Sequence, residues 1–569
     1  MGDLDQVVWG IDGIRGSVLT RKLKKPISRM NEAEILAELR KVDRELSWCE
    51  EETDYEGFHR FGGRENPRKD KAKEAERRKA KIGEPESVYN RLIARSLKVA
   101  RNPLALRAAD LRARRSLYDA LENQEEFVER RNKTRECYGK KRLKIDGPGE
   151  ISIGQAQRIL QTEADPGIRK AIYCALRIEL GDVEELFFDE IRTLNGLVAK
   201  IAPTAGHNFT NFFEVSANYC EAPSPEEIGG MMRRFVDETK EIYNKLVREL
   251  ISGVQIDQWD LSYLMTQKDP FTKLEVPQDP KVLFGLGLSI LKDLGYDSAF
   301  VDMLYDSKNP GVFLDIEQRE GKIPGAATFS LGPFSFGKNM LFFEPVIFSG
   351  NPRKRWGVFP HEFGHGVHHH FSRRAVRRNG AIFFIESTPG SETISETHED
   401  AAFDPIALEK YLGVKGDGAA HFAKWRLLND LAQLYGMARV TLGELAIHSK
   451  GVEYARSGSL EAELLTRPEI LRGKPTESTA YVTTPHIHGQ PGYYFAYFVA
   501  ALYERALSHS IREKNGTIFS PATARTLIDD IMVGNVAPMA DRIRKATGES
   551  DFIGSVIRDF KDEYKKLAA

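Results

Sequence analysis

Residues 359–399 read FPHEFGHGVHHHFSRRAVRRNGAIFFIESTPGSETISETHE, and they hold the most informative motif of the chain. Side chains four residues apart on an α-helix lie on one face, so His361 and His365 can present two imidazole nitrogens to a single metal ion. Glu362 sits at the edge of that face, where its carboxylate can reach a metal-bound water without being a ligand. Two ligands, an open coordination position and an adjacent base are what a zinc hydrolase requires. The motif therefore predicts one zinc ion, with Glu362 as the base.

A third protein ligand is expected in the same stretch, because catalytic zinc is usually held by three side chains. The candidates that follow the motif are Glu386, Glu392, Glu396, His398 and Glu399. We favour Glu392, since Ser395 and Glu399 follow it by three and seven residues and would support it from the same helical face. Glu399 could also accept the free ring N–H of a ligating histidine and fix its tautomer.

The alternative to a metal site is a solvent-facing helix with scattered histidines. Gly364 and Gly366 argue against it, because glycine is a poor residue for an exposed helix and suits a place where another backbone or a substrate comes close. Pro360 leaves two possibilities open. The helix either begins there, where a first-turn proline is tolerated, or is kinked there.

These motifs resemble those of the thimet oligopeptidase and oligoendopeptidase F family of zinc metallopeptidases. The family carries HE-F/L-GH with a further histidine three residues on, matched by residues 361–368, and then Glu-x-x-Ser-x-x-x-Glu, matched by residues 392–399. Three other pieces are similar to family segments: residues 259–263, 314–326 and 486–494. The resemblance implies that His361, His365 and Glu392 hold the zinc ion.

The second informative stretch, residues 481–497, reads YVTTPHIHGQPGYYFAY. Peptide hydrolysis creates an oxyanion, and a Tyr O–H or His N–H aimed at that oxygen lowers the barrier. An aromatic helix start packed in the core is the alternative. The resemblance implies that a histidine and tyrosines act here: His488 fits one family spacing and His486 fits the local context. Tyr493 is the first tyrosine candidate and Tyr497 the second.

The composition is that of a soluble globular protein with two or more domains: 569 residues, 41% hydrophobic and 29% charged. A net charge of −1 gives no field that selects nucleic acid. The four cysteines form no CxxC pair, which suits a reducing compartment. The first ten residues lack the apolar core of a signal peptide, and no window approaches a membrane span. We therefore expect a cytoplasmic protein with no membrane partner.

Residues 64–81 are the most basic part of the chain, with nine Lys or Arg against four Asp or Glu. No aromatic residue interleaves these charges, so no platform for stacking bases is present. A solvated helix or loop is favoured over a nucleic-acid site. We expect no nucleic-acid partner.

Helical patterns dominate the rest of the chain, notably at residues 31–56, at 224–252 and from 404 onward, for example 422–446. Ser224, Pro225 and Glu227 form the N-cap, first-turn proline and capping box of the second of these helices.

Two stretches break the helical pattern. Residues 311–348, rich in Gly, Pro and Phe, read as short strands and loops. Within them Met340–Phe343 is expected either as an edge strand that binds an extended peptide or as part of a buried hairpin. Gly147-Pro148-Gly149 is a candidate joint.

Together these patterns predict a mainly α protein with a small β element next to the zinc helix. The resemblance adds two helical lobes flanking a deep substrate cleft. Residues 1–200 would form the N-terminal helical lobe and residues 201–569 the catalytic region.

The function that the resemblance implies is hydrolysis of internal peptide bonds in short unfolded peptides. An exopeptidase would share this chemistry, but it needs a charged group that binds a chain terminus, and no local motif identifies one. A non-catalytic peptide-binding protein is a second alternative, against which the intact Glu362 argues. The sequence does not indicate an oligomeric state.

Overall fold

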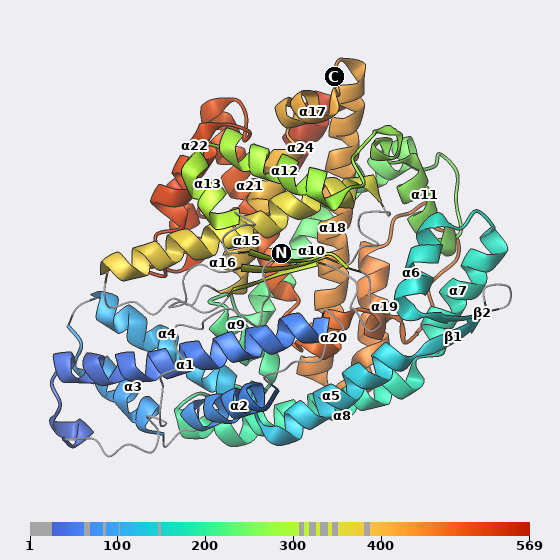
Figure 1. Cartoon of the computed structure of the whole chain (residues 1–569). Helices are drawn as coiled ribbons and strands as arrows, with labels where there is room; N and C mark the ends of the chain where they lie inside the picture. Colours follow the sequence, from blue (N-terminus) through green and yellow to red (C-terminus); the bar gives the residue numbers. More distant parts are fainter. Residues whose placement is uncertain are drawn as a thin grey trace.

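The structure, a computed structural model, describes residues 25–61, 69–83, 87–101, 103–145, 149–305, 312–317, 326–330, 339–343, 351–379 and 387–568. In these ranges the chain is mainly α-helical with two small sheets (Figure 1), which confirms the predicted fold class. The division of the chain at residue 200 and the cleft between two lobes stay predictions.

In its described residues, the first part of the chain forms five α-helices, an antiparallel pair of strands and three further α-helices. Their bounds are α1 (Glu32–Phe61), α2 (Lys69–Gly83), α3 (Val88–Val99), α4 (Pro103–Glu122), α5 (Glu125–Lys140), β1 (Arg142–Ile145), β2 (Gly149–Ser152), α6 (Ile153–Thr162), α7 (Pro166–Ile178) and α8 (Gly181–Ile201). The described part of the basic run, residues 69–81, lies within helix α2. Strands β1 and β2 pair antiparallel. Of the predicted joint at residues 147–149, Gly149 begins β2, and residues 147 and 148 lie outside the described ranges.

The middle of the chain carries the second sheet and the HExxH motif, which is formed by His361, Glu362 and His365. Its elements are α9 (Phe212–Tyr219), α10 (Pro225–Leu250), α11 (Leu261–Lys268), α12 (Pro280–Asp293), α13 (Ser298–Tyr305), β3 (Val312–Asp315), β4 (Ala326–Ser330), β5 (Asn339–Phe343), α15 (Pro352–Asn379) and α16 (Thr388–Ala402). Helix α10 begins with the predicted capping box: Ser224 accepts from the Glu227 N–H, and the Glu227 carboxylate accepts from the Ser224 N–H.

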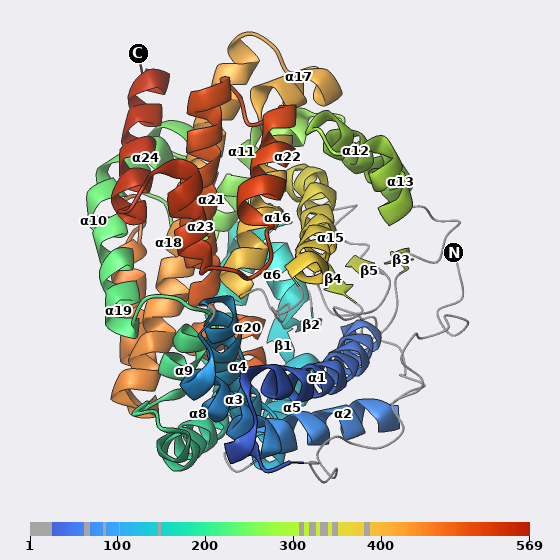
Figure 2. The same ribbon diagram turned by 90° about the vertical axis from the view of Figure 1, so that its left-hand side faces the viewer.

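The last part is helical again, as predicted. It comprises α17 (Pro405–Leu412), α18 (Asp417–Lys450), α19 (Ala455–Thr466), α20 (Pro485–Gly489), α21 (Phe495–Asn515), α22 (Pro521–Thr526), α23 (Met539–Thr547) and α24 (Phe552–Ala568). The largest hydrophobic core joins α10, α12, α15, α16, α18, α21 and α24. Figure 2 shows α10, α18, α21 and α24 on one side of α16, and α15 and the strands β3, β4 and β5 on its other side.

The three-stranded sheet has the order β3-β5-β4, with β5 parallel to β3 and antiparallel to β4. Of the two alternatives for residues 340–343, the edge strand is excluded, because β5 is hydrogen-bonded on both sides. The antiparallel pairing of β5 with β4 agrees with the hairpin alternative. Strand β4 is an outer strand of the described sheet. It reaches helix α15 through Thr328, whose side chain bonds to Glu362. The predicted β element thus does lie next to the helix with the HExxH motif.

Candidate metal centre

Helix α15 carries the HExxH motif well inside its length. It begins at Pro352 and continues to Asn379 with Pro360 in its interior, so the helix does not start at Pro360. The turn before the motif is fixed in the core by Trp356, which is buried and donates its indole N–H to the Ala402 carbonyl at 2.9 Å. Because Ala402 ends α16, this bond ties the two helices of the site together.

Helices α15 and α16 touch backbone to backbone at Gly364. A Cβ atom at this position would lie 2.7 Å from the Cα of Ser395, which is closer than two such atoms can approach. A Cβ atom at Gly357 would likewise lie 2.7 Å from a carboxylate oxygen of Glu399. The prediction that another backbone comes close to Gly364 is thereby confirmed.

The close approach places three metal-ligand atoms around one point. Glu392 Oε2 lies 3.5 Å from His361 Nε2 and 3.7 Å from His365 Nε2, and ligand atoms of all three residues fall within 4.8 Å of one another. Ligands at about 2.1 Å from a tetrahedral zinc ion are separated by about 3.4 Å. Two imidazoles and one carboxylate at this spacing therefore fit a zinc ion with one coordination position left open.

Each imidazole is oriented by a partner from α16. Nδ1 of His361 lies 3.0 Å from Glu399 Oε2, and Nδ1 of His365 lies 3.0 Å from Ser391 Oγ. With Nε2 turned to the ligand cluster, Nδ1 is the nitrogen that donates. The Glu399 contact is the one expected from the sequence, and the Ser391 contact is an addition. Ser395 also donates to Glu392 Oε2 at 3.3 Å, as its position predicted.

The other candidates for the third ligand differ in their surroundings. His398 is buried with its nitrogens bonded to the Ile394 carbonyl and the Tyr296 hydroxyl. Glu399 supports His361 instead of joining the cluster, and Glu396 is not among the clustered groups. Glu386 lies outside the described residues. Among the described candidates, Glu392 is the one whose carboxylate meets both histidines.

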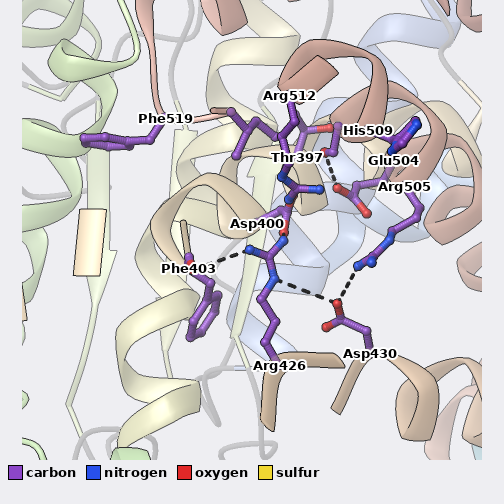
Figure 3. Close-up of polar contacts among 12 residues, drawn as sticks. Thr397, Asp400, Phe403, Arg426, Asp430, Glu504, Arg505, His509, Arg512 and Phe519 are labelled. Atoms are coloured by element: carbon purple, nitrogen blue, oxygen red, sulfur yellow. Dashed lines mark hydrogen bonds and ion pairs between the residues drawn. The ribbon is translucent and has the colours of Figure 1, made fainter. Parts of the chain in front are cut away.

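Helix α16 is anchored just beyond its ligand-bearing turns by a network of charges (Figure 3). Asp400 binds Arg426 of α18 and Arg512 of α21, and Arg505 of α21 binds Asp430 of α18 at 2.7 Å. Asp400 directly follows Glu399 in the chain. The network therefore holds the end of α16 from which Glu399 reaches His361.

The electrostatic environment keeps two of the three clustered groups, His365 and Glu392, in the form that binds a metal. Burial lowers the pKa of His365 to about 4, so its imidazole is neutral near pH 7. Burial alone would raise the pKa of Glu392, but the adjacent His365 and His361 lower it to about 2. Burial opposes protonation of His361, but hydrogen bonds to Glu392 and Glu399 and the charges of these carboxylates outweigh it and raise the pKa of His361. This ring therefore holds a proton that a bound metal ion would displace.

Glu362 lies beside the ligands without joining them. Its side chain is only 4% exposed, and the Thr328 hydroxyl donates to its Oε2 at 2.7 Å. Burial raises the pKa of Glu362 to about 7. Thr328 belongs to β4, 34 residues before Glu362, and no spacing in the sequence connects the two. Thr328 is therefore a residue of the site that could not be identified from the sequence.

Residues 485–497, which we call the donor segment, form α20, the connection after it and the first turn of α21. The His486 ring lies 5.4 Å from the Tyr497 ring, and the Tyr497 ring lies 5.9 Å from the Tyr493 ring. Burial raises the pKa of both Tyr493 and Tyr497, and the Glu392 carboxylate raises each further. Both phenols are thus close enough to Glu392 for its charge to affect their pKa values.

The two candidate histidines of the donor segment lie in different surroundings. His488 is 2% exposed, with its ring 4.5 Å from the Tyr138 ring of α5 and neither nitrogen hydrogen-bonded to a described residue. Burial and the nearby Arg135 lower its pKa to about 3. The carboxylate of Glu392 acts on the pKa of His486, but it is not among the groups that act on His488. His486 therefore lies on the side of the ligand cluster, and His488 faces α5.

Comparison with known proteins gives two findings and one negative result. The family model of peptidase family M3 matches residues 159–561. The fold is similar to that of a candidate oligoendopeptidase F solved by X-ray diffraction at 3.1 Å, with a TM-score of 0.63 and 16% identity over 87% of each chain. No curated protein gives a significant sequence match. Every helix among the described residues is too short or too polar to span a bilayer.

Proposed function

Because this chain belongs to peptidase family M3, we propose that it is a zinc-dependent oligopeptidase that cleaves internal bonds of short unfolded peptides. The observation that supports this most directly is the His361–His365–Glu392 cluster with Glu362 beside it. The three side chains would hold one zinc ion. When bound, zinc supplies a Lewis acid that makes water a nucleophile near neutral pH.

Glu362 would act as general base and then as general acid. Its carboxylate would accept a proton from the attacking water and deliver it to the leaving amine. The Thr328 hydroxyl, bonded to Oε2, limits the orientations of this carboxylate and leaves Oε1 for the proton. A base held in this way needs little rearrangement when the peptide arrives.

His486, Tyr493 and Tyr497 would stabilise the oxyanion that forms on the attacked carbonyl. The Tyr497 ring contacts the rings of both His486 and Tyr493, and the Glu392 carboxylate affects the pKa of all three residues. Both observations support this assignment. Tyrosines with a raised pKa stay protonated and can donate. His488, which fits one family spacing, is the weaker candidate because it is buried against α5.

A glutamine at position 362 tests the proposal. Glu362→Gln should retain about one zinc ion per chain and lose at least about 10³-fold in hydrolysis of an internally quenched fluorescent peptide, because the amide cannot take the proton. Chelation of the wild-type protein should abolish turnover, and added zinc should restore it. Turnover by Glu362→Gln at the wild-type rate would overturn the assignment of the base.

The mode of cleavage requires a separate experiment. Mass spectrometry of the products from a peptide blocked at both ends should show cleavage at internal bonds. Failure to cleave the blocked peptide, with removal of terminal residues from the free one, would favour the exopeptidase alternative. The cytoplasmic location and the lack of nucleic-acid and membrane partners stay predictions.

A further inference from the structure

A buried carboxyl group outside the ligand cluster contacts the donor segment. Glu444 lies on α18, is 1% exposed, and accepts a hydrogen bond from the backbone N–H of Gly492. The backbone of Tyr494 also affects the pKa of this carboxyl group through a hydrogen bond. Among the described residues no lysine, arginine or histidine forms an ion pair with it. Burying a carboxyl group without a cation is costly unless hydrogen bonds compensate. The Gly492 N–H satisfies Oε1, whereas Oε2 has no hydrogen-bond partner among the described residues, so the donor segment supplies the hydrogen bond that offsets part of this cost.

The backbone at Gly492 is enclosed from a second direction. Gly492 has a φ of +67°, a conformation that other residues rarely adopt. A Cβ atom there would lie 3.2 Å from the Cα of Phe213 at the start of α9. The segment thus passes close to α9 at Gly492, where a side chain would require the backbone to shift. Glu444 provides the hydrogen bond that holds the segment against α18.

The residues that follow Gly492 are those that would donate to the oxyanion. Tyr493 directly follows Gly492 in the chain. The Tyr497 ring contacts the Tyr493 ring edge to face, with ring centres 5.9 Å apart. A displacement of the Gly492 peptide would therefore be passed on to both phenols. Donors of this kind act only when they lie within hydrogen-bond distance of the developing charge, so their effect depends on where the backbone is held.

We propose that Glu444 is a positioning residue that fixes the Gly492–Tyr494 backbone and thereby aims Tyr493 and Tyr497 at the oxyanion. The inference rests on the proposed function, since it concerns transition-state donors of that reaction. Glu444 touches neither the metal ligands nor Glu362 by any contact that the structure describes, so it acts through the donor segment.

The decisive measurement is a double-mutant cycle. Glu444→Leu removes the acceptor and should lower kcat about 10-fold or more, with KM changed by no more than about threefold, because the donors act in the transition state. In a Tyr493→Phe background the same substitution should have an effect at least threefold smaller, since one of the donors it positions is already gone. Equal losses in both backgrounds, a change confined to KM, or an unchanged kcat would overturn the proposal.

Two further variants separate positioning from folding. Glu444→Gln keeps an acceptor oxygen for the Gly492 N–H and should recover kcat to within about threefold of wild type; a loss as large as that of leucine would contradict the proposal. Tyr435→Phe, also buried on α18, removes a hydroxyl that bonds to the Val236 carbonyl of α10 and should leave kcat unchanged. If Glu444→Leu does not fold, Gly492→Ala displaces the same backbone and should show the same dependence on Tyr493.

The result is distinguishable from failure of the proposed function. If Glu362→Gln hydrolyses peptide at the wild-type rate, the mechanism itself is wrong. If Glu362→Gln is inactive but the Glu444 cycle is additive, the mechanism stands and Glu444 has only a structural role.

Discussion

The ligand cluster and the donor segment are held in place by different means. In the cluster, side chains from two consecutive helices orient one another: Glu399 fixes His361, and Ser391 fixes His365. In the donor segment, the backbone is held by elements far away in sequence, with Glu444 of α18 bonded to Gly492 and Arg135 of α5 bonded to the Gly489 carbonyl. Metal affinity should therefore depend on local residues, and transition-state stabilisation on distant ones.

The largest effect is expected from removing a ligand in the first region. His365→Ala leaves two ligands and should reduce bound zinc from about one ion per chain to less than about 0.1, with loss of turnover of at least about 10³-fold. Metal analysis by mass spectrometry after dialysis provides the measurement. Full zinc content in this variant would mean that another residue is the second ligand.

Removal of a donor in the second region should leave the metal in place. His486→Ala and Tyr497→Phe should each keep the full zinc content and lower kcat by about 10²-fold to 10³-fold, the range observed when one oxyanion donor is removed. His488→Gln is the matched comparison and should change kcat by less than about threefold in the folded protein. If the effects of the two histidine substitutions are reversed, His488 is the donor.

A smaller effect on metal binding tests the support of the first region. Glu399→Gln weakens the hydrogen bond to His361 Nδ1 and should reduce zinc affinity by about 10-fold to 100-fold. Competition with a chromogenic chelator measures the change. The control is Glu409→Gln on α17, which loses only an exposed contact to Lys415 and should bind zinc like the wild type.

The smallest effect concerns the contact between His509 of α21 and Asp559 of α24, which belongs to neither region. His509 Nδ1 lies 2.7 Å from Asp559, and this hydrogen bond raises the pKa of His509 against the opposing effect of burial and of Arg505. A raised pKa in the folded state stabilises the protein below the unfolded pKa of about 6.5, and this contribution is lost as the pH rises through the folded value.

The free energy of unfolding should therefore differ more between wild type and His509→Gln at pH 6 than at pH 9. We expect a change of about 0.5–1 kcal/mol, since the ring is a third exposed and solvent screens the pair. Urea denaturation at both pH values measures it. An equal difference at the two pH values would show that the ring gains nothing from protonation in the folded state.

Most residues of the first region could be predicted from the sequence, because they lie within 40 residues of one another on two helices. The four-residue spacing of His361 and His365, and the Glu392–Ser395–Glu399 series, translate directly into faces of helices. Thr328 could not be identified from the sequence because its hydrogen bond to Glu362 depends on where the sheet places β4 relative to α15. The sequence also left open whether residues 340–343 form an edge strand or part of a hairpin, since apolar composition alone does not tell a central strand from an edge strand.

The second region was disclosed only in part for a similar reason. Its aromatic residues indicated a candidate site. The sequence could not show whether His486 or His488 faces the ligand cluster, because this depends on which of them packs against α5. Glu444 lies 48 residues from Gly492 and follows no motif, so only the packing of α18 against the segment identifies it. Contacts between distant elements are set by tertiary structure, which periodicity does not encode.

The contact at Gly364 has a consequence for how the site can move. Since α15 and α16 meet there without intervening side chains, neither can slide or rotate against the other unless the backbones separate. Any relative movement of the elements around this site must therefore carry both helices together, with His361, His365 and Glu392 keeping their arrangement.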